Sequence, residues 1–319
     1  MKSRTVRVLF AVAVSAVFLA LVLRGVDPGA LRSTFVGLDR TKLVVAWGAA
    51  FVVVTLRSVR FAVLARTPHV PTWAATTVQN FANRVLPLRL GEIAYPWMME
   101  RSTGLGFADA VIDVVFVRLV DLCVAVTVVL GLAWNAGPRA HLADTRVLAL
   151  LAVVCVGTLV AFRPLLVRVL EIVQRFARAR AYPRLLAFTG KIADAAARAG
   201  RLRPRDHAVI LVASTVQFVA QAVVFGAVLA ACHVEVGPAD VALATSLTFV
   251  GGAVLSGGVG TLGSLEVGWV LGFVAVGVSR EAATSSAFVC QWVTMSFAAF
   301  HGLVGWVLFR RRAHLLPVQ

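Results

Sequence analysis

Long apolar runs constrain this chain of 319 residues more than any other feature. A helix that crosses a bilayer needs about 20 mostly apolar residues. The strongest candidates cover residues 5–24, 42–64, 107–134, 145–162, 207–231 and 282–309. With 60% hydrophobic and 14% charged residues, the composition excludes disorder and argues against a soluble domain. We therefore predict an all-α polytopic membrane protein with about six full spans.

Two further apolar regions, residues 72–101 and 239–278, are interrupted by glycine, proline or charged residues. Backbone that leaves the helix at membrane depth is tolerated only where protein or a water-filled cavity satisfies its polar groups. We interpret each region as a re-entrant hairpin made of two half-helices.

Basic residues set the predicted orientation. They gather in the segments on one side of the membrane, where the positive-inside rule places the cytoplasm. The segments counted on that side include the loop at residues 163–206 and Lys2, Arg4, Arg7, Arg57, Arg60, Arg66, Arg310, Arg311 and Arg312. Both termini are expected in the cytoplasm of a cell-membrane protein. The basic loop is expected to attract anionic inner-leaflet lipid.

This orientation divides the chain into two parts, residues 1–134 and 145–312, which have the same element order but opposite directions across the membrane. Each part has two spans, a hairpin and a final span. The arrangement is an inverted-topology repeat. Transporters built in this way bind substrate near the midplane, where interrupted helices of the two parts meet.

The first hairpin carries ionisable residues at the predicted bilayer centre. Arg84 and Arg89 flank the expected N-terminus of the returning half-helix, and Glu92 follows. A helix N-terminus beside arginines suits an anion, and the phosphate of a lipid headgroup is the most available one. The alternative is scaffolding, in which Arg89 and Glu92 pair with each other or with Arg118 and Asp121.

The third span carries Arg118 and Asp121 on one helix face. Both are expected to point toward the hairpins, because exposing a charge to acyl chains costs about 2–3 kcal/mol or more. An intrahelical salt bridge is the alternative. Gln217 and Gln221, one turn apart in the fifth span, are predicted either to line a polar path or to bridge helices.

The second hairpin is rich in glycine. We expect Gly260, Gly263 and Glu266 to border a cavity, because glycine lets the backbone approach a ligand closely. Tight packing of small residues is the competing explanation.

Several function classes lack support. The chain has no phosphate-binding GxxxxGK[ST] loop, no HExxH pair, and no serine with a recognisable histidine base. Its four cysteines occur singly. No metal and no cofactor are predicted. The net charge of +16 is attributed to cytoplasmic loops and lipid contact rather than to nucleic acid.

The motif residues resemble a known family. They are Asn83, Pro87, Arg89, Gly91 and Glu92, then Arg118 and Asp121, and a late glycine turn before Glu266. This pattern resembles the transmembrane region of lysylphosphatidylglycerol synthases, a family that includes flippase-like proteins. The resemblance implies lipid headgroup handling and translocation between leaflets. The family often has arginine where Tyr95 stands and proline where Val259 stands. The soluble aminoacyl-transfer domain is absent, so we do not expect synthesis of lysyl-lipid.

The leading hypothesis is a flippase-like protein that binds a phospholipid or glycolipid headgroup between the hairpins. Without an ATP motif, transport would be passive or coupled to ions or protons through the carboxylates. One alternative is an intramembrane transferase for a lipid-linked substrate, with Glu92 or Asp121 as the base. Another is a non-catalytic membrane partner of a lipid-modifying enzyme.

Overall fold

The computed structural model describes residues 28–86, 90–136, 203–254 and 264–313, with isolated positions between 168 and 194. Every regular element in these residues is a helix. The predicted spans 5–24 and 145–162 and most of the basic loop lie outside the described residues.

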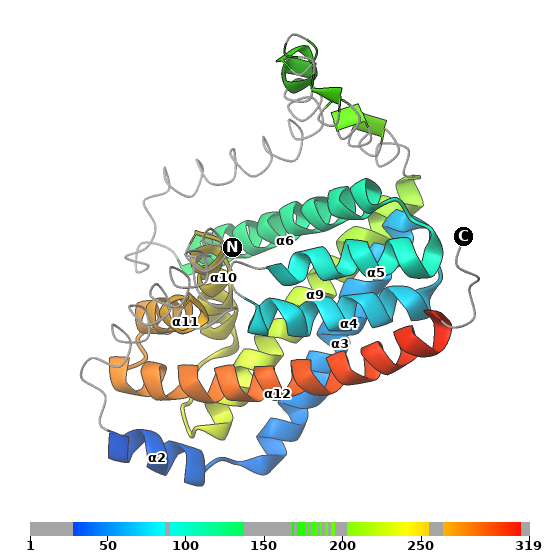
Figure 1. Ribbon diagram of the computed structural model, residues 1–319. Helices are drawn as coiled ribbons and strands as arrows, with labels where there is room; N and C mark the ends of the chain where they lie inside the picture. The colour runs from blue at the N-terminus through cyan, green and yellow to red at the C-terminus, as the bar shows by residue number, and fades with distance from the viewer. Residues whose placement is uncertain are drawn as a thin grey trace.

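The helices form two sets with the same order of long, short, short and long elements (Figure 1). After α2 (Pro28–Val36), the first helix set comprises α3 (Arg40–Ala65), α4 (His69–Val85), the 3-10 turn η1 (Leu90–Ile93), α5 (Ala94–Thr103) and α6 (Phe107–Ala136). The second helix set comprises α9 (Pro204–Ala231), α10 (Pro238–Val254), α11 (Ser264–Ala275) and α12 (Arg280–Ala313).

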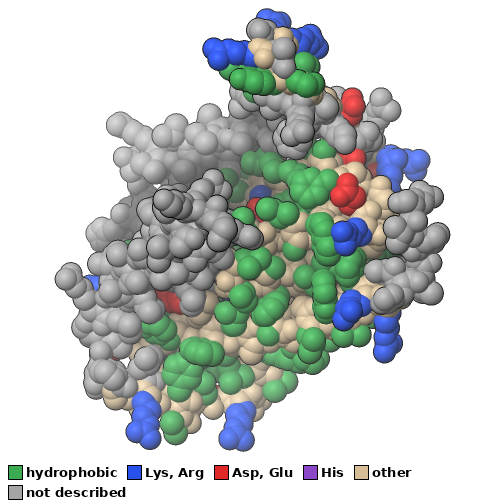
Figure 2. Space-filling view, in the orientation of Figure 1, with side chains coloured by type: hydrophobic (Ala, Val, Ile, Leu, Met, Phe, Trp, Pro, Cys, Tyr) green, Lys and Arg blue, Asp and Glu red, His purple; other side chains and the backbone are tan. Residues whose placement is uncertain are grey.

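Four of the helices are long and apolar enough to cross a membrane: Arg40–Ala65, Phe107–Leu132, Pro204–Ala231 and Arg280–Arg311. They confirm the predicted helices at 42–64, 107–134, 207–231 and 282–309. Figure 2 shows apolar side chains spread over the visible face of the molecule, with Lys and Arg mainly at its edges. Such a surface suits lipid, because acyl chains offer charged groups no hydration.

Local sequence explains where the first long helix begins and ends. The Asp39 carboxylate accepts a hydrogen bond from Thr41 N at 2.8 Å, which caps the N-terminus of α3. Arg66 then takes a left-handed conformation with φ of 51°, and Pro68 follows. The chain therefore reverses between α3 and α4 within a few residues.

The two interrupted regions are helix pairs. In the first, α4 ends at Val85 and η1 begins at Leu90. Gly91 makes the return possible, because a Cβ atom there would lie 2.6 Å from Asn83 Oδ1 and even closer to the α4 backbone. In the second, α10 ends at Val254 and α11 begins at Ser264, with residues 255–263 between them outside the description.

The two sets interlock. Helix α3 packs along α9, α4 packs along α12, and α6 packs against α10 (Figure 1). The final long helix of each set therefore contacts the first short helix of the other. The α4–α12 contact is very close: a Cβ atom on Gly302 would lie 2.7 Å from Phe81 Cβ, and one on Gly305 would lie 2.8 Å from Ala74 O.

The short helix pairs contact opposite ends of α12. Trp269 of α11 donates a hydrogen bond to Ser286 at 3.1 Å, near the start of α12. Trp97 of α5 packs on Phe309, near its end, with ring centroids 5.8 Å apart. These contacts are separated by about 23 residues, or about 34 Å of helix.

Candidate functional site

A cavity of about 480 Å³ lies between the two helix sets. Five of the residues predicted from sequence line it together: Asn83, Arg84, Glu92, Arg118 and Asp121. They come from α4, from η1 directly after it, and from α6. The fold therefore gathers at one place the polar residues that interrupt the apolar segments of the first helix set.

The other predicted residues have different positions. Glu266, in the first turn of α11, is fully buried and does not line the cavity, although its charge acts on Arg84. Arg89, Gly260 and Gly263 lie outside the described residues.

Arg84 joins the tip of α4 to the second helix set. Its Nη1 donates a hydrogen bond to Thr294 Oγ1 at 2.8 Å. Thr294 lies near the middle of α12, so Arg84 stands about as far as possible from both ends of that helix. Among the described residues, its buried Nε has no hydrogen-bond partner.

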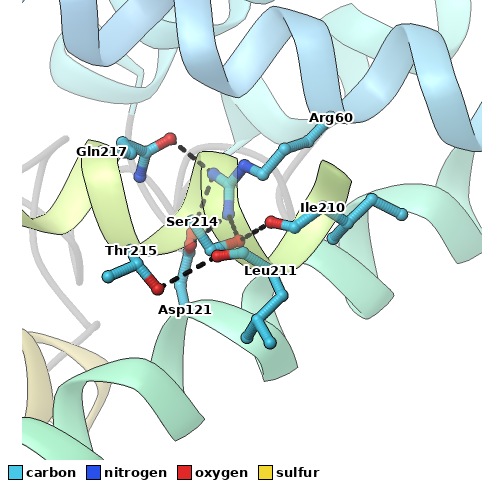
Figure 3. A network of polar contacts seen from close by, with 7 residues as sticks. All are labelled: Arg60, Asp121, Ile210, Leu211, Ser214, Thr215 and Gln217. Atoms are coloured by element: carbon cyan, nitrogen blue, oxygen red, sulfur yellow. Dashed lines mark hydrogen bonds and ion pairs between the residues drawn. The ribbon is translucent and has the colours of Figure 1, made fainter. Parts of the chain in front are cut away.

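Arg60 is the centre of a network that sequence analysis did not predict (Figure 3). Its side chain is fully buried and forms an ion pair with Asp121 of α6. On α9, Arg60 donates to Ser214 Oγ at 2.9 Å and to Gln217 Oε1 at 2.5 Å. Gln217 therefore bridges α9 and α3, and together with Gln221 it also lines the cavity, so both predicted roles fit it. The network holds α3, α6 and α9 together through one guanidinium, whose fixed fork suits several acceptors at once.

The placement of Arg60 and Arg57 corrects the sequence interpretation, which counts both with the cytoplasmic charges. Arg60 is inside the helix bundle, and Arg57 lines the cavity one turn earlier on α3. Both positions follow from helical geometry, because residues three apart share a face of the helix. That face is turned inward.

Arg57 differs from Arg60 in having no partner. It forms no hydrogen bond and no ion pair with any residue that the structure describes. The charges that act on it are those of Arg118, Arg60 and Arg84, opposed by Asp121. Asp121 is already bound to Arg60. Arg57 is therefore a cation at membrane depth that faces open space.

Arg118 and Glu92 form a second ion pair at 3.2 Å, between α6 and η1. Arg118 and Asp121 do not pair with each other. Arg118 points to the first predicted hairpin and binds Glu92, a pair that the scaffolding alternative includes, whereas Asp121 binds Arg60 of α3 rather than a hairpin residue. This second pair faces the cavity, and its side chains are 41% and 32% exposed.

The polar lining divides by helix set. The charged residues described on it, namely Arg57, Arg84, Glu92, Arg118 and Asp121, all belong to the first set. The second set contributes uncharged groups, with histidine counted as neutral: Ser214, Gln217, Gln221, Thr248, Thr294 and His301. With Arg60 and Glu266 included, four arginines face three carboxylates among the described residues, an excess of one positive charge.

That excess favours an anionic ligand, because an uncompensated charge in a poorly hydrated interior is costly. Arginine is also the side chain best shaped for phosphate. Among the described residues, no group of three His, Cys, Asp or Glu side chains is arranged to hold a metal ion.

A helical bundle with four membrane-length helices around a cavity that holds charged and apolar groups defines a multi-pass membrane protein. Residues 8–302 match the family described as the lysylphosphatidylglycerol synthase TM region, and the chain belongs to that family. This confirms the resemblance found in the sequence and places the protein among membrane proteins of lipid metabolism or transport. Neither the curated proteins nor the solved structures include a match to the chain.

Proposed function

We propose that the protein binds the phosphate-bearing headgroup of a phospholipid or lipid-linked glycan in the cavity and carries it between the leaflets of the cell membrane. Arg57 carries this proposal. It is an arginine within a membrane-length helix, it faces a cavity, and it has no partner among the described residues. Ionisable groups at this depth usually mark a substrate path.

The neighbouring groups complete a phosphate site. Arg84 has an unpartnered Nε, and Asn83 and Asn80 also line the cavity. An arginine and side-chain amides bind phosphate oxygens by charge-assisted and neutral hydrogen bonds. Uncharged groups on the opposite wall, such as Gln221 and Thr248, suit the hydroxyl or amine groups of a headgroup.

The architecture supports movement between leaflets. We propose that the two helix sets form an inverted repeat, that each short helix pair is a re-entrant hairpin, and that both termini are cytoplasmic. The common element order, the interlocked packing and the contacts at opposite ends of α12 favour this arrangement. Arg84 beside the middle of α12 fits a site near the bilayer midplane.

The cavity favours transport over transferase chemistry. A transferase needs a carboxylate that can accept a proton. Both carboxylates that line the cavity are already bound, Glu92 to Arg118 and Asp121 to Arg60. Each of these carboxylates is therefore engaged by an arginine rather than free to contact a substrate hydroxyl.

The test is translocation of a fluorescent phosphatidylglycerol in reconstituted vesicles, with Arg57→Gln compared with the wild-type protein. Loss of one charge-assisted hydrogen bond costs about 1.5–3 kcal/mol, so we expect translocation to fall about 10-fold to 100-fold. Arg40→Gln is the matched control, because Arg40 is an exposed arginine at the start of the same helix. It should behave as the wild type.

Equal translocation by Arg57→Gln and the wild-type protein would rule out a role for this arginine in binding the headgroup. A new covalent lipid product would instead identify a transferase. If the purified protein shows neither activity but co-purifies with a lipid-modifying enzyme, it is a membrane partner of that enzyme.

A further inference from the structure

An aromatic cluster stands between the cavity and the outer surface, and the proposed function leaves it unexplained. We define the aromatic seam as Trp47 and Phe51 of α3, Trp73 of α4, and Phe300 and His301 of α12. The rings pack in a continuous layer: Trp47 and Phe300 have centroids 4.9 Å apart, and His301 lies 5.7 Å from both Trp47 and Phe51.

The inner side of the seam belongs to the cavity. His301 is only 5% exposed and lines the cavity. Phe297, one turn earlier on α12, also lines it and packs on Trp47 at 5.4 Å. The residues that border the headgroup site are therefore in direct contact with the seam.

The outer side of the seam faces away from the protein. Trp47, Phe51 and Phe300 are 38%, 49% and 50% exposed, although all three are large and apolar. They lie on two helices of membrane length, so the surface on which they are exposed is the one that acyl chains contact. Side-chain rings between α3 and α12 thus separate the cavity from the hydrocarbon.

We propose that the aromatic seam is the lateral exit through which the hydrocarbon chain of the substrate leaves the cavity, so that the substrate is a complete membrane lipid rather than a soluble anion. This inference rests on the proposed function. A lipid whose phosphate binds Arg57 has to keep its chains in the bilayer, and the seam connects the cavity to that surface. Aromatic rings can turn aside by rotation about their side-chain bonds without breaking helix hydrogen bonds.

The hydrogen bonding within the aromatic seam allows its rings to move aside. Trp73 donates a hydrogen bond to Thr55 Oγ1 at 3.3 Å, which ties α4 to α3. In contrast, no hydrogen bond between described residues joins Trp47 or Phe51 to Phe300 or His301; ring contacts alone hold these together. The rings of Trp47, Phe51 and Phe300 can therefore turn aside while α3, α4 and α12 keep their packing.

The experiment places a reversible cross-link across the seam. Trp47→Cys and Phe300→Cys are combined in a protein whose native cysteines, Cys123, Cys155, Cys232 and Cys290, are replaced. A short dithiol-reactive reagent joins the pair in vesicles that contain fluorescent phosphatidylglycerol. We expect translocation to fall to the level of protein-free vesicles and to return after reduction. The control pair, Gly226→Cys with Val241→Cys, links α9 to α10 away from the seam and should leave translocation unchanged.

The outcomes separate the two proposals. A wild-type protein that moves no lipid overturns the proposed function. A wild-type protein that moves lipid, together with a cross-linked protein that moves it equally well, overturns the seam alone. Uptake of inorganic phosphate is measured in the same vesicles. Phosphate uptake that survives the cross-link, without lipid movement, would identify a soluble anion and contradict the inference.

A second variant keeps the test independent of folding of the double mutant. Trp47→Cys alone is labelled with a bulky maleimide, which fills the seam, and translocation is expected to fall. Trp292→Cys is the matched control, because Trp292 is 67% exposed on α12 but is not part of the seam. If both labelled proteins translocate equally well, the seam is not the exit.

Discussion

The two helix sets have nearly the same architecture but present different chemical groups to the cavity. Their helices have 26, 17, 10 and 30 residues in the first set and 28, 17, 12 and 34 in the second. Every charged residue that the structure describes on the cavity lining belongs to the first set, whereas the second contributes uncharged polar groups. Similar folds on the two sides of a cavity thus carry different chemistry.

The comparison also separates two uses of arginine within the first set. Arg60 is bound through both Nη atoms to Asp121 and to two acceptors on α9, and only its Nε has no hydrogen-bond partner among the described residues, whereas Arg57, one turn away, has no partner among the described residues. The paired arginine holds the two sets together. The unpartnered one is available to a ligand. Proximity and residue type are therefore insufficient to assign a role, and the partners of each side chain decide it.

The largest loss of stability is expected when Arg60 loses its carboxylate partner, Asp121. Asp121→Ala leaves the buried guanidinium of Arg60 with uncharged acceptors alone. We expect a loss of about 3 kcal/mol in the free energy of unfolding, the lower end of the range for a broken buried pair, because the Asp121 side chain is 23% exposed. Denaturant unfolding in detergent micelles measures it.

The double variant Arg60→Met with Asp121→Leu is the control for this prediction. Replacing a buried ion pair by apolar groups of similar size is often neutral. The double variant should recover most of the lost stability. If it is as unstable as Asp121→Ala, packing rather than an unpaired charge explains the loss.

Most of the described fold is predictable from the sequence because long apolar runs allow few solutions in a membrane. The four long helices and both interruptions follow from hydrophobic length and from residues such as Gly91. The interlocking of the two sets does not, because it depends on close helix approach. That approach is made possible at Gly302 and Gly305 by contacts with residues about 220 positions earlier, which a local pattern does not encode.

The second largest loss of stability is expected where the two helix sets interlock, at the contact of α12 with α4. Gly305→Val adds a branched side chain where α12 meets Thr77 and Ala74 of α4. Overpacking of this kind costs about 1–3 kcal/mol in the free energy of unfolding. Gly48→Val on α3 is the matched control, since a Cβ atom at Gly48 meets nothing within 4 Å. Equal stability of the two variants would show that α4 and α12 are not in tight contact.

The sequence predicts residues of the candidate site only where polar or charged side chains occur within apolar segments. Asn83, Arg84, Glu92, Arg118 and Asp121 interrupt predicted membrane segments, and the structure brings all five to one cavity. The arginines at positions 57 and 60 carry the same signal, because they lie inside the predicted span 42–64. The sequence interpretation nevertheless counts them with the cytoplasmic charges. Only the three-dimensional packing shows that this helix face is turned inward.

The third prediction changes the neutral wall into a charged one. Thr294→Asp places a carboxylate where Arg84 now donates to a hydroxyl at 2.8 Å. The new ion pair should neutralise Arg84 and lower lipid translocation about tenfold, equivalent to about 1.4 kcal/mol of lost binding. Thermal stability should not fall. Thr294→Ser keeps the hydroxyl and should translocate as the wild type. Unchanged translocation by Thr294→Asp would show that the uncharged character of this wall is unimportant.

The smallest change in stability is expected at the ion pair of Arg118 and Glu92. This pair tests whether exposure to water weakens an ion pair relative to the buried one formed by Arg60. Its side chains are 41% and 32% exposed to the cavity, whereas Arg60 in the other pair is fully buried. Solvated ion pairs contribute about 0–1 kcal/mol, because water competes for both partners. A double-mutant cycle of Arg118→Ala and Glu92→Ala should therefore give a coupling energy below about 1 kcal/mol. A coupling energy as large as that of Arg60 with Asp121 would mean that water does not reach the cavity. The headgroup would then have to enter a dry site, at a much greater desolvation cost.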